Sequence, residues 1–191
     1  MEMIPQLLNE IEKSLQQLDH SCVDHLNPGI SSQKIQELFE EIPLQPTQDL
    51  RALYTWRNGS KGCEGITLGD LAFFPGFYLM SLEESIQTYQ ELRKTSTWNQ
   101  CWFPIFANGG GDFYAMNLAI EAKGEMIGYY IYEEEPQIEY NSLESMLQTF
   151  KECYKQGIIF QNEQGYLDMD YRKHAEIAHE INPNLKIWLE F

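Results

Sequence analysis

The stretch WFPIFANGGGDFYAMNL, residues 102–118, decides the fold. An apolar run rich in aromatic residues enters a turn of three glycines, Gly109–Gly111, and a second run leaves the turn with side chains that can face two ways. This pattern is typical of a β-hairpin at the middle of a sheet, because successive residues of a strand point to opposite faces. We therefore expect Trp102 and Phe103 to lie on opposite faces of that sheet.

The composition describes an acidic globular chain. It has 191 residues, of which 43% are hydrophobic and 13% aromatic, enough for one domain whose core is built on large rings. The formal net charge is −16, from 13 Lys and Arg against 29 Asp and Glu. Without an excess of basic groups to displace counterions, nucleic acid and anionic membrane surfaces are disfavoured as partners. A basic partner would be attracted.

The cysteines and the first residues favour a reducing compartment. The four cysteines form no Cys-x-x-Cys pair and have no histidine at ligand spacing, so buried free thiols are favoured over a disulfide framework or a zinc site. The start of the chain lacks the basic and apolar regions of a signal peptide. No apolar run approaches the roughly 18 residues of a membrane span. We expect a cytoplasmic protein without metal or cofactor.

Helical signals stand on both sides of the hairpin. Apolar residues recur at three- and four-residue steps over 3–18, which predicts an amphipathic helix, and residues 19–31 are expected to form a loop. Side chains that can cap a helix predict further helices, because they accept hydrogen bonds from its first free amides. These caps are Ser31 or Ser32, Thr47, Ser81, Asn141 and Asp170.

Strand signals occupy residues 71–80, broken at Pro75-Gly76, and residues 126–132, where Gly128 permits close approach of another group. Helices come first, then strands connected by hairpins, then helices. That order indicates an α+β fold rather than alternating βαβ units.

Two segments near the end of the chain carry weaker signals. Residues 158–160 and 166–168 flank a polar turn and predict a small hairpin. The tail 185–191 is too apolar to be loose, so we expect it to dock on the fold or to pair at a sheet edge.

No catalytic constellation is evident. The four histidines are expected at the surface, and His174 and His179, five residues apart, cannot form the paired ligands of a metalloprotease helix. Ser142 fits a helix cap better than a nucleophile. Asp168 and Asp170 could ligate a cation, but their spacing does not match an EF-hand loop.

Two glycine-rich segments could hold a ligand. Residues 59–69 contain four glycines without the spacing of a P-loop, which favours a mobile surface loop. The turn at 109–111 precedes a strand, so it lacks the helix N-terminus that makes most glycine loops anion sites. We expect Asn108 and Asp112 to satisfy the backbone of this turn.

Four local patterns in order resemble the SUKH superfamily, which includes the yeast Smi/Knr-type cell-wall regulators and many bacterial immunity proteins. They are the helix with its Asn-Gly stop over 43–59, the strand and helix start over 77–84, the hairpin at 102–118, and the turn, strand and helix start over 124–143. Together they cover roughly residues 30–155.

The resemblance implies a single α+β domain over residues 1–191, with a mixed or antiparallel sheet of about five to six strands flanked by helices. The helix over 3–18 and the segment 158–191 would pack on the matching region. The family is not chiefly catalytic: bacterial members commonly bind and neutralise a toxin of the same strain, often a nuclease. The family often has Asp-Leu where this chain has Asn117-Leu118, so a role for that carboxylate does not carry over.

The leading hypothesis is a cytoplasmic bacterial immunity protein, not an enzyme, that binds a basic cognate toxin of the nuclease class through an acidic surface. The acidic run at 133–135 could mimic phosphates, or it could be a solvated strand end that discourages edge pairing. The alternatives are a non-catalytic regulatory module related to cell-wall regulators, and an enzyme with a pocket over the sheet that uses Asp112 or Asn117. The candidate contact residues are Glu64, Asp70, Asp112, Glu133, Glu134 and Glu135.

Overall fold

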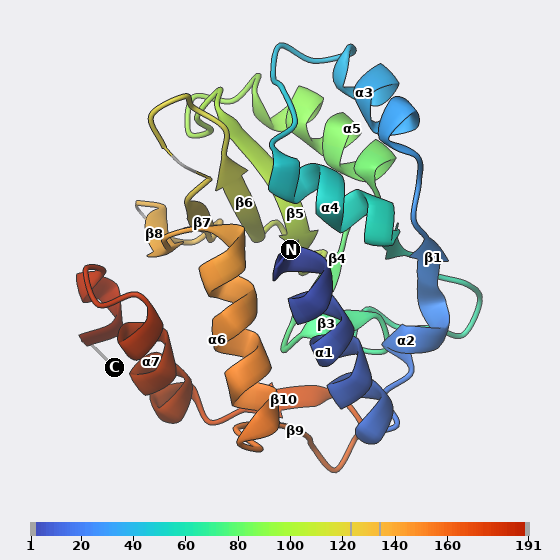
Figure 1. The fold of residues 1–191 in the computed structure, drawn as a ribbon, viewed down its shortest axis with the longest axis vertical. Helices are drawn as coiled ribbons and strands as arrows, with labels where there is room; N and C mark the ends of the chain where they lie inside the picture. Colours follow the sequence, from blue (N-terminus) through green and yellow to red (C-terminus); the bar gives the residue numbers. More distant parts are fainter. Residues whose placement is uncertain (1–2, 123, 134, 190–191) are drawn as a thin grey trace.

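The computed structural model describes residues 3–122, 124–133 and 135–189, and it is built around one six-stranded antiparallel sheet (Figure 1). The strands follow one another in chain order across the sheet, so the sheet is a meander. The predicted α+β class, with a sheet flanked by helices, is confirmed. The strands are β3 (Ala72–Phe74), β4 (Phe77–Leu79), β5 (Trp102–Ala107), β6 (Phe113–Asn117), β7 (Met126–Tyr129) and β8 (Gln137–Tyr140).

Helices cover the sheet and lie at its ends. In Figure 1, α6 stands in front of the sheet with α1 on one side and α7 on the other. The helices are α1 (Met3–Gln17), α2 (Cys22–His25), α3 (Ser32–Phe39), α4 (Gln48–Trp56), α5 (Leu82–Leu92), α6 (Leu143–Lys155), α7 (Tyr171–Ile181) and the 3-10 helix η1 (Lys186–Leu189). None of them, within the residues that the structure describes, is long and apolar enough to cross a membrane.

The hairpin at 102–118 forms as predicted, from β5 and β6. The Asn108 Oδ1 atom accepts hydrogen bonds from the Gly110 amide at 2.7 Å and from the Asp112 amide at 3.1 Å. Gly109 and Gly111 have φ angles of 74° and 108°, which residues with a Cβ rarely adopt. The turn is therefore held by hydrogen bonds from its backbone amides to the side chain of Asn108.

The two faces of the sheet carry cores of different size. On one face the Phe74 ring stacks on Phe150 of α6 with ring centroids 3.8 Å apart, and fully buried Phe103 packs on Phe39 of α3. On the other face, Trp102 lies in a small aromatic cluster around Trp98. Trp102 and Phe103 thus lie on opposite faces, as predicted.

The predicted caps hold the helix starts. Ser31, Thr47, Ser81 and Asp170 each accept a hydrogen bond from the amide three residues later. Helix α6 is capped by Ser142 rather than Asn141, and the Ser145 hydroxyl accepts from the Ser142 amide in return. The Glu84 carboxylate, three residues after Ser81, accepts a hydrogen bond from the Tyr78 hydroxyl at 2.7 Å.

The apolar tail, of which the structure describes residues 185–189, docks on the fold as predicted. The Trp188 side chain is buried, and its indole Nε1 donates to the backbone carbonyl of Glu139 in β8 at 2.7 Å. The small hairpin is also confirmed, as β9 (Ile159–Gln161) paired with β10 (Leu167–Met169).

Several local predictions are wrong. Residues 19–31 are not a plain loop, because they contain α2 and the strand β1 (Leu26–Pro28). This strand pairs with β2 (Arg57–Ser60), so Asn58-Gly59 lies in a strand that follows α4 directly. Strand β8 was not predicted, because its charged and short sequence resembles a loop.

The expected exposure of two residue types also needs correction. His20 and His174 are buried rather than at the surface. All four cysteines are free, but only Cys22 and Cys153 are buried, whereas Cys63 is exposed and Cys101 half-buried. Burial therefore follows position in the fold, not residue type.

Candidate binding site

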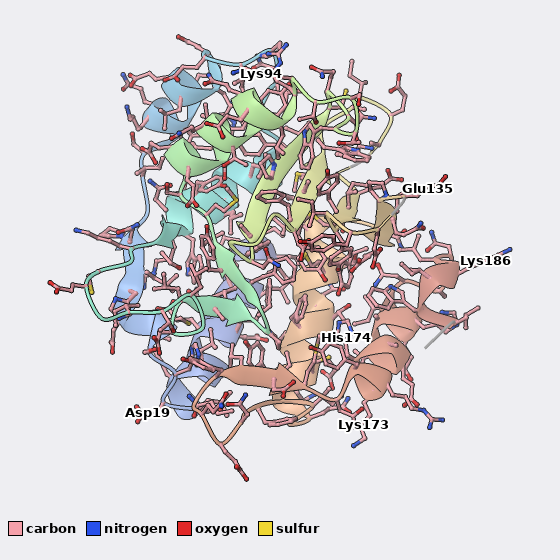
Figure 2. The ribbon with its side chains drawn as sticks, turned by 180° about the vertical axis from the view of Figure 1, so that it is seen from behind. Asp19, Lys94, Glu135, Lys173, His174 and Lys186 are labelled. Carbon is pink, nitrogen blue, oxygen red and sulfur yellow. The ribbon has the colours of Figure 1, made fainter. Side chains whose placement is uncertain are left out.

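A cavity of about 260 Å³ lies where β6, the loop after β7 and strand β8 meet α7 and η1. In Figure 2, His174 lies inside the molecule between α6 and α7, while Glu135 and Lys186 mark the outer edge on the same side. The lining residues are Tyr114, Tyr130, Glu133, Glu139, Met169, Tyr171, His174, Ile187 and Trp188. A mostly apolar and aromatic wall with a few polar groups is typical of a binding pocket.

The described cavity lining contains two buried polar residues, Glu139 and His174, and each is only 4% exposed. The Oε1 atom of the Glu139 carboxylate accepts a hydrogen bond from the Tyr130 hydroxyl at 2.8 Å, and its Oε2 atom accepts one from the Tyr114 hydroxyl at 3.0 Å. The two hydroxyls themselves are 3.3 Å apart. Three groups from β6, β8 and the loop after β7 thus form one buried network.

A β-bulge and a glycine place this carboxylate. Met126 pairs with Tyr140 and Ile127 pairs with Ile138, so Glu139 is the extra residue between two consecutive residues of β7. Bulges of this kind re-aim a side chain. Across the sheet, a methyl group on Gly128 would overlap the Glu139 Oε1 atom, which confirms the predicted close approach at Gly128.

Burial changes the ionisation of the groups in the cavity. It raises the pKa of Glu139 to about 7, against the opposing effect of the two tyrosine hydrogen bonds, and the nearby Glu133 carboxylate raises it further. Burial lowers the pKa of His174 to about 4, so this imidazole is neutral at pH 7. Its Nε2 atom lies 3.1 Å from the Tyr140 hydroxyl. At pH 7 the Glu139 carboxyl group is therefore about half ionised, and His174, the histidine among the described lining residues, is not an imidazolium.

Three loops adjoin one another, and the last of them also lines this cavity; we call them together the loop face: residues 61–71, residues 108–112, and residues 130–133 with 135–136. A methyl group on Gly109 would overlap Leu68, and one on Gly111 would lie 3.0 Å from the Ile131 Cδ1 atom. The Asp112 Oδ1 atom accepts a hydrogen bond from the Ile131 amide at 2.9 Å. The glycine turn is thus the middle member of the three loops.

The predicted contact residues have different surroundings. The Asp112 carboxylate is engaged with the Ile131 amide and the Asn108 side chain. Asp70 accepts from the Thr67 hydroxyl at 2.7 Å and amide at 2.8 Å, and these hydrogen bonds lower its pKa. Both acids hold turns. Their part in partner contact stays a prediction.

Four predicted contact residues remain: Glu64, Glu133, Glu134 and Glu135. Glu64, Glu133 and Glu135 are exposed, and Glu134 lies outside the described residues. Glu133 is the predicted residue that also lines the cavity. The structure thus brings Asp112 and Glu133 to neighbouring loops, with Glu64 on the loop beyond.

Sequence reasoning missed Glu139, Tyr114, Tyr130 and His174. The hydrogen-bonded network depends on a bulge and on strand pairing, which no local pattern displays. The one available signal was Gly128, because a glycine inside an aromatic strand indicates that another group comes close. Among the described residues, no group of three or more His, Cys, Asp or Glu side chains could hold a metal ion.

The model of the SMI1 / KNR4 family (SUKH-1) matches residues 29–149. This range contains the whole six-stranded sheet with Tyr114, Tyr130 and Glu139, whereas α7 and η1, which form the other wall of the cavity, follow it. No curated protein matches the chain.

Proposed function

Because the chain belongs to the SMI1 / KNR4 family (SUKH-1), we propose that it works by binding a protein partner. The four sequence patterns had already indicated a resemblance to this family. The proposed role is that of a bacterial immunity protein, acting in the cytoplasm and without catalysis. Its partner would be a cognate toxin, basic and of the nuclease class. The protein would occlude the active cleft of that toxin.

The composition of the loop face is the observation that carries this proposal. Tyr132 is 97% exposed and Ile131 is 51% exposed, next to the exposed acids Glu133 and Glu135. Protein interfaces combine aromatic and aliphatic anchors with a polar rim, and tyrosine is enriched among the residues that dominate binding energy. A net charge of −16 would also speed the encounter with a basic partner.

The test measures inhibition of the purified toxin encoded beside this gene, together with survival of cells that express it. Tyr132→Ala should weaken binding by about tenfold or more, as expected for an anchor residue. The double variant Glu133→Gln/Glu135→Gln should lower the association rate and its salt dependence.

A matched control carries the same charge change elsewhere. Glu163→Gln/Glu180→Gln removes two exposed acids that do not belong to the loop face, and it should leave inhibition close to the wild-type value. Equal inhibition by all variants would remove the loop face from the proposal. Cells that survive the toxin equally well without this gene would refute the immunity role.

A further inference from the structure

We propose that the cavity between β8 and α7 receives one arginine side chain of the protein partner, with the Glu139 carboxylate as its counter-charge. The inference rests on the proposed function, because it assigns the anchor contact of a partner that docks on the loop face.

Glu139, when ionised, is an uncompensated charge among the described residues of this cavity. None of the described residues that line the cavity is Lys or Arg, and no ion pair between described residues includes Glu139. A buried carboxylate without a cation is costly, and a partner that supplies one removes that cost. The two tyrosine hydroxyls occupy one acceptor position on each oxygen, whereas a carboxylate offers about four. Acceptor capacity for a guanidinium therefore remains.

The walls of the cavity have a shape and chemistry that suit a guanidinium group. The rings of Tyr130, Tyr171 and Trp188 line the cavity. A guanidinium is flat, stacks on aromatic faces and can donate two parallel hydrogen bonds to a carboxylate, whereas an ammonium is a compact, strongly hydrated charge. The volume of about 260 Å³ is below the roughly 300–1,000 Å³ of pockets for drug-sized ligands. It suits a single long side chain.

A side chain of a partner can enter the cavity from the loop face. Tyr171 is 59% exposed and Glu133 is exposed, so the cavity reaches the surface between them. Glu133 follows directly on Ile131 and Tyr132, the exposed apolar pair of the loop face. A partner seated on that pair can extend a basic side chain past Glu133 toward Glu139.

The charged and titratable neighbours of Glu139 support the same reading. Those that line the cavity are Tyr114 from β6, Tyr130 and Glu133 from the loop after β7, and Tyr171 and His174 from α7. Tyr140 of β8 also interacts with the charge of Glu139, and burial raises the pKa of its phenol. Burial keeps His174 neutral by lowering its pKa, and burial raises the pKa of Tyr114 and Tyr130, so neither phenol adds a charge at neutral pH. Lys186 of η1 is exposed and is not part of the cavity lining. An arriving guanidinium would thus meet the carboxyl groups of Glu133 and Glu139 and no competing cation among these groups, and its charge would favour the ionised form of Glu139.

The test uses the isolated protein and a small probe, so it does not depend on the toxin. N-acetyl-L-arginine amide is titrated while the Trp188 indole resonance is followed by NMR, with N-acetyl-L-citrulline amide as the neutral analogue of the same shape. We expect saturable binding with a dissociation constant of about 1–10 mM for the arginine probe, because so small a ligand offers few contacts. The citrulline probe should bind at least about tenfold more weakly, because it lacks the charge.

Variants assign the binding to this cavity. Glu139→Gln should weaken the arginine probe by about tenfold or more, and Tyr171→Ala, a change at the exposed mouth, by several-fold through the lost stacking. Glu10→Gln, an acid on α1 outside this cavity, is the matched control and should have no effect. Equal binding of the two probes would overturn the inference, as would unchanged binding after both Glu139→Gln and Tyr171→Ala. Stronger binding of N-acetyl-L-lysine amide would overturn the choice of arginine.

The same variants separate the two proposals in a toxin assay. If Tyr132→Ala weakens toxin binding while Glu139→Gln leaves it unchanged, the arginine pocket is refuted and the immunity role stands. If the arginine probe binds as expected but the toxin is not inhibited by the wild-type protein, the immunity role fails, and with it the assignment of the pocket to that partner.

Discussion

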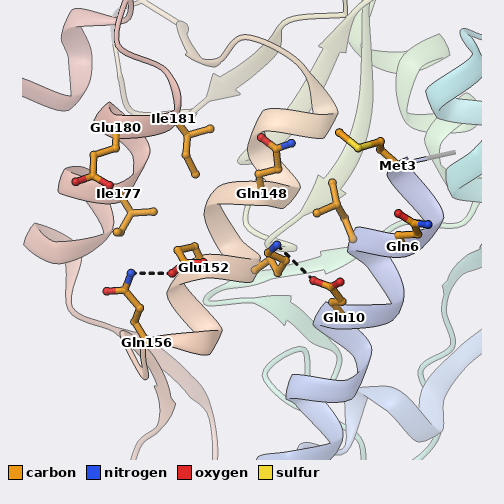
Figure 3. A pocket seen from close by; sticks show the side chains of 11 residues that line it. Met3, Gln6, Glu10, Gln148, Glu152, Gln156, Ile177, Glu180 and Ile181 are labelled. Carbon is orange, nitrogen blue, oxygen red and sulfur yellow. Dashed lines mark hydrogen bonds and ion pairs between the residues drawn. The ribbon is translucent and has the colours of Figure 1, made fainter. Parts of the chain in front are cut away.

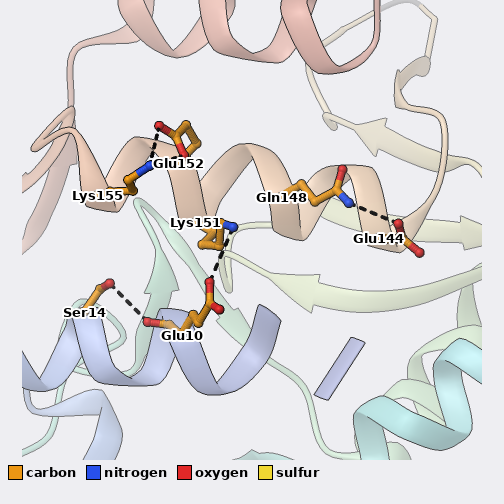
Figure 4. Close-up of polar contacts among 7 residues, drawn as sticks. All are labelled: Glu10, Ser14, Glu144, Gln148, Lys151, Glu152 and Lys155. Atoms are coloured by element: carbon orange, nitrogen blue, oxygen red, sulfur yellow. Dashed lines mark hydrogen bonds and ion pairs between the residues drawn. The ribbon is translucent and has the colours of Figure 1, made fainter. Parts of the chain in front are cut away.

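Two hollows of this molecule differ in how their charges are paired. The groove between α1, α6 and α7 measures about 470 Å³ and is lined largely by polar side chains (Figure 3). There Lys151 Nζ lies 3.4 Å from Glu10 Oε2, and Glu152 Oε2 lies 3.3 Å from the Nζ atom of Lys155, which is on the next turn of α6 and outside the groove lining (Figure 4). The smaller Glu139 cavity holds a buried carboxyl group with two tyrosine hydroxyls, and none of its described lining residues is Lys or Arg.

The difference teaches that volume is a poor guide to a binding site. Solvated ion pairs such as those of the groove are already satisfied, so a ligand gains little by displacing them. Glu139 is a residue only 4% exposed with no ion-pair partner among the described residues, so a partner that supplied a positive charge would gain more there. The predictions below change each hollow in turn.

The largest effect is expected at Gly128. Replacing it with alanine puts a methyl group on the Glu139 carboxylate, which is fixed by β8 and by two hydrogen bonds. We expect Gly128→Ala to lower the free energy of unfolding by about 4 kcal/mol, a value typical of a clash that also breaks a buried polar network. Urea unfolding followed by tryptophan fluorescence measures it.

Two further variants make this result specific. Gly62→Ala is the matched control, because its new methyl group would meet only the Leu71 side chain at 3.8 Å, and its effect should stay within about 0.5 kcal/mol. Adding Glu139→Ala to Gly128→Ala should recover more than half of the loss. If the double variant is no more stable than Gly128→Ala, the clash is not with Glu139.

The next effect is a pH dependence from Glu139. Its pKa is raised from 4.5 to about 7 in the folded state, so the unfolded chain loses this proton first as pH rises. Folding stability should therefore fall between about pH 4.5 and 7, by on the order of 3 kcal/mol in total from this group. Glu139→Gln should remove that decline. Denaturant unfolding of both proteins from pH 4 to 8 measures the difference.

His174 acts in the opposite direction and must be separated. Its pKa is lowered from 6.5 to about 4, so its contribution to stability is complete above pH 6.5 and is lost as pH falls toward 4. The two groups oppose each other below pH 6.5, but His174 cancels when wild type and Glu139→Gln are subtracted. Parallel stability curves for the two proteins would show that Glu139 is not buried with a raised pKa.

A smaller effect is expected from the hydroxyl of Tyr114. Tyr114→Phe removes the hydrogen bond to Glu139 Oε2 and leaves a buried acceptor with one partner fewer, at a cost of about 1–3 kcal/mol at pH 7. The variant should also raise the pKa of Glu139 further, because the hydrogen bond from Tyr114 stabilises the ionised carboxylate and is absent in the variant. Tyr129→Phe is the control, since its hydroxyl makes only an exposed 3.3 Å contact with Thr97. Equal costs for the two variants would contradict a special network at Glu139.

Much of the fold could be predicted because its decisive signals are local. The glycine turn, the capping residues and the apolar periodicity of α1 each specify a short segment, and each formed as expected except that Ser142 rather than Asn141 caps α6. The buried Phe103 and half-buried Trp102 also follow from simple alternation along a strand. The arrangement of these pieces in a meander is consistent with the family match over residues 29–149.

The candidate site could be predicted only at its rim. Glu133 and Asp112 stand out as acids at turns, but Glu139 becomes special only when β8 pairs with β7 through a bulge and Gly128 leaves space for its carboxylate. His174 lies 35 positions beyond Glu139 in the numbering and enters the cavity through the docking of α7. Neither event has a local signal, since both depend on contacts between residues far apart in sequence.

The smallest effect is expected in the groove. Lys151→Met breaks the ion pair with Glu10, whose two side chains are 32% and 55% exposed, and should change the free energy of unfolding by less than about 1 kcal/mol because water and salt screen exposed charges. A double-variant cycle with Glu10→Gln measures the coupling directly, which we expect to be at most about 0.5 kcal/mol. The same variants should leave binding of the arginine probe unchanged. A coupling of several kcal/mol, or a loss of probe binding in Lys151→Met, would mean that the groove is the more consequential of the two hollows.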